Sequence, residues 1–110
     1  MVKTVSNNKI KIGLVQTSVS DDIDANLAKT AKFIKEAAKK GAQIVCLQEL
    51  FNTKYFPQFK NNSAFKLAET IPGKTTAILS AIARDLKIVI IAPIFEKSLK
   101  KKSLYSCSLN

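Results

Sequence analysis

Apolar residues recur along the chain with two different spacings, and the change of spacing marks the predicted elements. Residues 9–16 and 42–48 hold short apolar clusters that favour β-strands. Between them the apolar positions step by three or four residues, which places them on one face of a helix. This face consists of Ile23, Leu27, Ala31, Ile34 and Ala38.

The ends of this helix carry the expected signals. Ser20, Asp21 and Asp22 precede it as candidate N-caps, and Gly41 is well placed as the residue after its C-cap. A strand, a helix and a second strand of these lengths predict a right-handed βαβ unit with two parallel strands.

The second half of the chain repeats the pattern, which predicts an α/β fold. Thr75 or Thr76 is a candidate cap for a second helix. Its apolar face would be Ile78, Leu79, Ile82, Ala83 and Leu86. A third strand is expected over residues 88–95, where Pro93 indicates an edge or a bulge, and a fourth over residues 104–109.

Length and composition exclude several classes of protein. With 110 residues, 46% of them apolar, the chain is expected to form one domain with a core. It holds no apolar run of about 20 residues and no apolar signal segment after Met1. Two separated cysteines and the lack of histidine argue against a metal site and a disulfide framework. These features predict a cytoplasmic protein without a metal.

The net charge of +10 raises the alternative of a module that binds nucleic acid or another polyanion. However, Arg84 is the only arginine, and arginine is the residue that favours base readout and bidentate phosphate binding. A solvated lysine-rich surface is therefore preferred, and a nucleic-acid partner is not expected.

One carboxylate stands out, because the strand over residues 42–48 is followed directly by Glu49. In open α/β sheets chemistry gathers just beyond the carboxyl ends of the strands, so Glu49 is a candidate general base. The alternative is an exposed carboxylate without a role. The aromatic residues between Leu50 and Ser63 would either form a pocket rim or pin this loop to the core.

At this point the order of motifs resembles a known family. Gly41–Phe51 resembles the segment that carries the catalytic glutamate of nitrilase-superfamily carbon–nitrogen hydrolases, and Tyr55-Phe56 with Gln58 resembles the N-carbamoylputrescine amidase branch. Asn26-Leu27 and Ala83–Leu86 resemble the family's two helices. The resemblance covers the chain from about Lys9 onward.

The resemblance implies a fold and an activity. Residues 1–110 would form the N-terminal part of a four-layer α-β-β-α sandwich, an incomplete carbon–nitrogen hydrolase domain. The family uses a Glu-Lys-Cys triad without a cofactor to hydrolyse small-molecule amides or carbamoyl amines. N-carbamoylputrescine would yield putrescine, CO2 and ammonia, a step of polyamine biosynthesis. Glu49 would be the general base and Tyr55 an aromatic residue near the substrate or a loop anchor. The full-length family is expected to form homo-oligomers.

The other two members of the triad are not matched. The family's lysine and cysteine belong to later segments, and neither Cys46 nor Cys107 is expected to be the nucleophile. The chain is therefore expected to be a truncated piece that is inactive alone, with one sheet face uncovered and Ile88–Ile91 prone to aggregation. A non-catalytic remnant or a basic polyanion-binding module remains the alternative.

Overall fold

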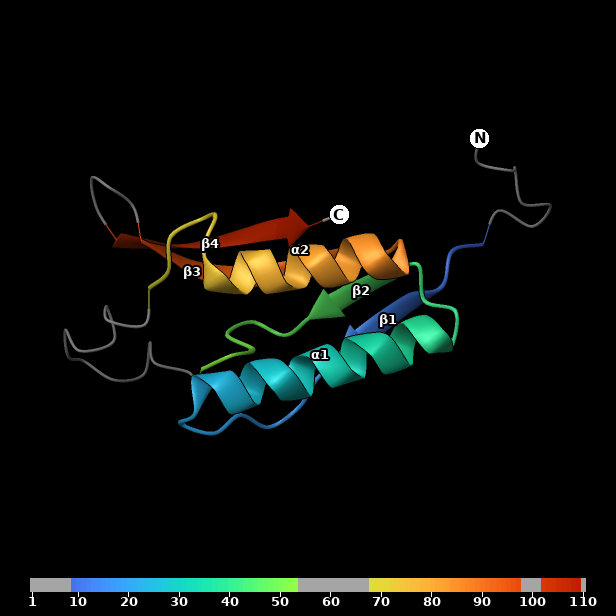
Figure 1. Cartoon of the computed structure of the whole chain (residues 1–110), viewed down its shortest axis with the longest axis horizontal. Coiled ribbons are helices and arrows are strands. Elements are labelled where there is room, and N and C mark those ends of the chain that lie inside the picture. Colours follow the sequence, from blue (N-terminus) through green and yellow to red (C-terminus); the bar gives the residue numbers. More distant parts are fainter. Residues whose placement is uncertain (1–8, 54–67, 98–101, 110) are drawn as a thin grey trace.

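A four-stranded sheet carries two helices on one face (Figure 1). The structure, a computed structural model, describes residues 9–53, 68–97 and 102–109, with side chains described up to residue 96. Its elements in chain order are β1 (Ile12–Val15), α1 (Ile23–Lys39), β2 (Ile44–Leu47), α2 (Lys74–Leu86), β3 (Val89–Lys97) and β4 (Lys102–Leu109).

The strand order is β1-β2-β3-β4. β1 pairs with β2 and β2 with β3 in parallel, whereas β3 and β4 are antiparallel. The predicted α/β class and the predicted parallel pair are therefore confirmed. In each parallel step the chain crosses over through a helix, so the carboxyl ends of β1, β2 and β3 lie at the same edge of the sheet.

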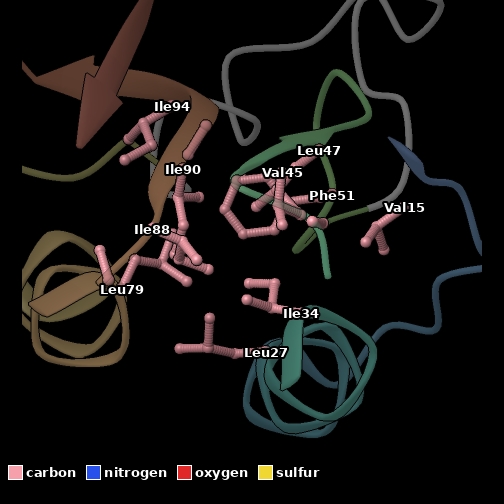
Figure 2. Packing of buried hydrophobic residues seen from close by; sticks show 13 residues of the cluster. Val15, Leu27, Ile34, Val45, Leu47, Phe51, Leu79, Ile88, Ile90 and Ile94 are labelled. Carbon is pink, nitrogen blue, oxygen red and sulfur yellow. The ribbon is translucent and has the colours of Figure 1, made fainter. Parts of the chain in front are cut away.

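The hydrophobic core lies between the helices and the sheet (Figure 2). Leu27 and Ile34 from α1 and Leu79 from α2 face Val45 of β2 and Ile90 of β3. The predicted face of α1 packs against the sheet, whereas of the predicted face of α2 Leu79 and Ala83 are buried and Ile78 and Leu86 are exposed. Burial of such side chains is the main term that stabilises the fold.

The termini of α1 follow from local chemistry. The side chain of Asp22 accepts a hydrogen bond from the backbone N–H of Ala25 at 3.1 Å and caps the first turn. Gly41 follows the helix with a φ of 97°, a left-handed conformation that favours glycine. Of the three predicted cap residues, Asp22 is the one that serves.

The start of α2 differs from the prediction. Gly73 is the N-cap, and Thr75 and Thr76 lie inside the first turn. Gly73 occupies this position because a Cβ there would lie 2.3 Å from the carbonyl oxygen of Thr70. Thr76 still takes part, since its hydroxyl accepts the Gly73 N–H at 2.6 Å. The threonine was correctly linked to the helix start, but it acts from inside the helix.

The face of the sheet opposite the helices is apolar as well. The strand register aligns Ile12 with Ile44 and Val89 in one row. A second row consists of Leu14, Cys46 and Ile91. Ile12 is 58% exposed and Leu14 79% exposed. We call these six residues the open face.

Pro93 lies in a central strand, not at an edge. Proline is tolerated there because β2 pairs with β3 only as far as Ile91, so Pro93 lies beyond the parallel ladder. On its other side Pro93 pairs with Ser106 of β4. The prediction of an edge was wrong because β3 is longer than the strand it pairs with in parallel. Glu69 forms an isolated parallel bridge with Glu96 of β3.

A search for helices with the length and apolarity needed to cross a membrane finds none in the described ranges.

Candidate active site

Glu49 lies at the carboxyl end of β2, two residues after Leu47, the last residue of that strand. β2 has a parallel neighbour on each side, so Glu49 follows an interior strand of the sheet. Its side chain is exposed, and within the described ranges its carboxylate has no recorded hydrogen bond or ion pair. The predicted strand-end position is confirmed, and the carboxylate is open to an incoming group.

The chain turns sharply directly after Glu49. Leu50 has a φ of 54°, a left-handed conformation that costs a residue with a Cβ about 1–2 kcal/mol. The turn is held in this form because Leu50 and Phe51 are both buried. Phe51 belongs to the core cluster, so this ring pins the loop. The role of the later aromatic residues stays open, since they lie outside the described residues.

On the side of β1, the turn is held by the amide side chain of Gln48. Its Oε1 accepts the backbone N–H of Thr17 at 2.6 Å, and its Nε2 donates to the carbonyl oxygen of Thr17 at 2.8 Å. The β1–β2 ladder ends with the pair Val15 and Leu47. Gln48 therefore continues the pairing with its side chain, directly next to Glu49.

On the other side, Asn26 of α1 connects two loops. Its Nδ2 donates to the backbone carbonyl oxygens of Ser20, at 2.8 Å, and of Asn52, at 3.0 Å. Its Oδ1 accepts the backbone N–H of Ser20 at 2.8 Å. Asn26 is buried, and a buried amide without partners would destabilise the fold. The buried Asn26 therefore connects α1 to the loop that follows Glu49.

The side chain of Asn52 reaches toward α2. Its Nδ2 lies 3.1 Å from Oε2 of Glu69 and 3.4 Å from the hydroxyl of Thr75. Glu69 also accepts the hydroxyl of Thr75 at 2.7 Å and the backbone N–H of Thr75 at 3.2 Å. A carboxylate at a helix N-terminus is favoured by the helix dipole. Because both oxygens of Glu69 accept hydrogen bonds, its role is to join α2 to the Glu49 loop.

The helix N-termini are also linked by charge at the surface. Lys74 of α2 forms an ion pair with Asp24 of α1. The hydrogen bond that Lys74 donates to Asp24 and the negative charge of that carboxylate raise the pKa of Lys74 above its ordinary value. Both side chains are exposed, so solvent and salt weaken this contact.

Most of the remaining predicted site residues lie outside the part of the chain that the structure describes. Tyr55 and its motif lie outside the described residues, as does the side chain of Cys107. Cys46 is half-buried on the open face. Within the described ranges no three His, Cys, Asp or Glu side chains gather as metal ligands.

Sequence reasoning missed the hydrogen bonds of Gln48, Asn52 and Glu69. A signal was present for Asn26, which is polar but adjoins Leu27 on the buried helix face. The partners of Gln48 and Asn52 lie 31 and 17 or more residues away in sequence, so no local pattern indicates them.

Comparison with known proteins identifies the class. The model of the carbon-nitrogen hydrolase family matches residues 11–110, which is most of the chain. The chain belongs to the carbon-nitrogen hydrolase family. The strand-end position of Glu49 and the resemblance of its flanking motif agree with this assignment.

The chain is similar over most of its length to two curated relatives. The omega-amidase NIT2-B of Xenopus laevis is 47% identical over 87 residues, which are 76% of this chain and 29% of that protein. The N-carbamoylputrescine amidase of Solanum lycopersicum is 31% identical over 93 residues, 84% of this chain and 31% of that protein. The chain thus spans about a third of the length of the curated relatives it matches.

Solved structures agree on the fold. The carbon-nitrogen hydrolase of Helicobacter pylori G27 matches 83% of this chain with a TM-score of 0.76 and 33% identity, and the match covers 32% of that chain. Nit3 of Saccharomyces cerevisiae, a member of the nitrilase superfamily, matches 92% with a TM-score of 0.73 and 31% identity. The described fold is the N-terminal part of the nitrilase-type four-layer sandwich.

Proposed function

We propose that this chain provides the general base of a hydrolase acting on non-peptide carbon–nitrogen bonds, and that Glu49 is this base. The family match carries the reaction class. The observation that carries the residue is the position of Glu49, an accessible carboxylate just beyond an interior strand, on a turn anchored to β1, α1 and α2. The family match favours this function over a basic polyanion-binding module.

The chemistry follows from the triad that the family resemblance implies. Glu49 takes the proton of a cysteine thiol, which attacks the carbonyl carbon of the substrate. A thiol with a pKa near 8.5 is mostly protonated at neutral pH, so a positioned base is required. A lysine ammonium stabilises the oxyanion of the tetrahedral intermediate. Glu49 then delivers the proton to the leaving amine and later accepts one from the water that hydrolyses the thioester.

Two substrate classes have support. The Tyr55-Phe56 motif and the tomato relative support N-carbamoylputrescine, which would place the protein in polyamine biosynthesis. The higher identity to omega-amidases supports an ω-amide. The products distinguish them, because hydrolysis of a carbamoyl amine releases the amine, CO2 and ammonia, whereas hydrolysis of an ω-amide releases a carboxylic acid and ammonia without CO2.

The isolated chain is expected to be inactive. We expect no ammonia release from N-carbamoylputrescine by residues 1–110 alone, because the chain matches only one member of the triad. Turnover by this polypeptide that Glu49→Gln abolishes would contradict this expectation.

The base itself is tested in a chimera. Residues 9–110 replace the matching segment of the Xenopus laevis omega-amidase, and ammonia release from an ω-amide is measured. The Glu49→Gln chimera should lose activity, whereas Glu36→Gln, an exposed glutamate on α1, should keep it. Equal activity of both variants would refute the role of Glu49.

A further inference from the structure

Two amide side chains flank the Glu49 turn, and each is bound to a different part of the fold. Gln48 precedes Glu49 and Asn52 follows three residues after it. An exposed glutamate has three rotatable side-chain bonds, so its carboxylate samples a wider volume still when the backbone that carries it also moves. The hydrogen bonds of the two amides decide how well this backbone is fixed.

The contact of Gln48 replaces a missing part of the sheet. Beyond Val15 and Leu47 the strands no longer pair, and the backbone donor and acceptor of Thr17 would need water. The amide of Gln48 satisfies both groups, at 2.6 and 2.8 Å. Two hydrogen bonds to one residue define an orientation as well as a distance. The last peptide before Glu49 is thereby tied to the end of β1.

Asn52 fixes the other end of the turn in two ways. Its backbone carbonyl oxygen accepts the buried amide of Asn26 from α1. Its side chain donates to Glu69, whose carboxylate is bound to the first turn of α2 through Thr75. The residues between the two amides are Glu49 and the buried pair Leu50 and Phe51. Of these three residues, Glu49 alone has an exposed side chain.

We propose that Gln48 and Asn52 are positioning residues that fix the backbone of Glu49 and so the direction in which its side chain leaves the turn. This proposal rests on the proposed function, since a direction matters only if Glu49 transfers protons. Reacting groups must be held within about 0.5 Å of the productive geometry, and a misplacement of 1 Å costs about 100-fold in rate. A turn bound to β1, α1 and α2 before substrate arrives supplies this precision.

The sequence contains a matched control for Gln48. Gln43 lies at the opposite end of β2, where its Oε1 accepts the backbone N–H of Lys11 at 3.3 Å. Both glutamines therefore bind the backbone next to β1, but only Gln48 adjoins Glu49. Gln48→Met and Gln43→Met remove the same amide chemistry and retain the length of the side chain.

The experiment measures NMR order parameters of residues 48–53 and the χ1 populations of Glu49 in the chain of residues 1–110. In the unaltered chain Glu49 should be rigid, with an order parameter near 0.85. Gln48→Met should lower this value below about 0.6 and average χ1. Gln43→Met should leave both unchanged, and Asn52→Ala should loosen residues 50–53.

The proposal is overturned if Gln48→Met leaves the order of Glu49 as it is in Gln43→Met. If Gln48→Met does not fold, the unaltered chain decides, because a backbone order parameter of Glu49 below about 0.6 there is incompatible with a fixed turn and a value near 0.85 supports it. These readouts need no turnover. Loss of the proposed function, seen as full activity of the Glu49→Gln chimera, is therefore distinguishable from failure of the positioning.

Discussion

The two faces of the sheet have the same chemistry and different surroundings. Ile90 and Ile91 are neighbours of the same type on β3, yet Ile90 is fully buried against the helices and Ile91 is 37% exposed on the open face. Alternating residues of a strand point to opposite faces, so the difference comes only from what covers each face. Strands that are apolar on both faces are typical of a sheet covered on both sides.

In a four-layer α-β-β-α sandwich two sheets pack face to face, so we expect the open face to be the one that meets the second sheet. In the described part of the chain the helices cover one side only. The comparison therefore separates residues that stabilise this chain by itself from residues that stabilise contact with a second layer. The predictions below use this separation and are ordered by their expected effect on the free energy of unfolding.

The largest effect is expected for Ile90→Ala. It removes a fully buried side chain from the core and should lower the free energy of unfolding by about 2–5 kcal/mol, as buried Ile→Ala changes do. Ile91→Ala is the matched control and should cost less than about 1 kcal/mol. Both are measured by denaturant unfolding. Similar losses for the two variants would show that the faces are not different in this chain.

The hydrogen bonds behind Glu49 should have the next largest effect. Asn52→Ala leaves Glu69 without its amide donor and should cost about 1–3 kcal/mol. Thr70→Ala is a suitable control, because its exposed hydroxyl donates to the carbonyl oxygen of Pro72 in the same loop. An Asn52→Ala variant as stable as the unaltered chain would mean that the hydrogen bonds of Asn52 do not stabilise the fold.

The open face should affect association more than stability. We expect the chain to self-associate through this face, and Leu14→Gln should reduce the association while changing the free energy of unfolding by about 0.5 kcal/mol or less. Phe33→Gln on α1 removes a different exposed apolar side chain and should leave the association unchanged. Sedimentation decides between these outcomes, and a single monomeric species for the unaltered chain would contradict the expectation.

The smallest effect is expected for the ion pair on the helix side of the fold. Lys74→Met should destabilise the chain only slightly, and less at high salt. Because the pKa of Lys74 is raised in the folded chain, the contribution is present at neutral pH and is lost as the pH rises through that raised pKa. A loss that is independent of both salt and pH would assign the effect of Lys74 to packing.

The sequence predicted the local features of this fold well. The α1 face, the Asp22 cap, the Gly41 terminus and the parallel pair depend on spacing and on neighbouring residues, and all four are confirmed. The errors concern Pro93 and the start of α2. They arise because strand length and the close approach of Thr70 to Gly73 depend on tertiary packing.

For the site, the sequence placed Glu49 but not what holds it. A strand followed by a carboxylate is a local pattern, whereas the bonds of Gln48 to Thr17 and of Asn52 to Glu69 join distant parts of the chain. The sequence also did not show which aromatic rings after Glu49 pack in the core. Phe51 and Tyr55 belong to the same aromatic segment, and only the structure shows that Phe51 is a core residue.

The catalytic role of Glu49 is tested most directly by the turnover number of the chimera with the Xenopus laevis omega-amidase. General-base catalysis contributes about 100- to 10,000-fold, so Glu49→Gln should reduce kcat by at least about 100-fold relative to the Glu36→Gln chimera. A Glu49→Gln chimera that hydrolyses the ω-amide at the rate of the Glu36→Gln chimera would contradict the account.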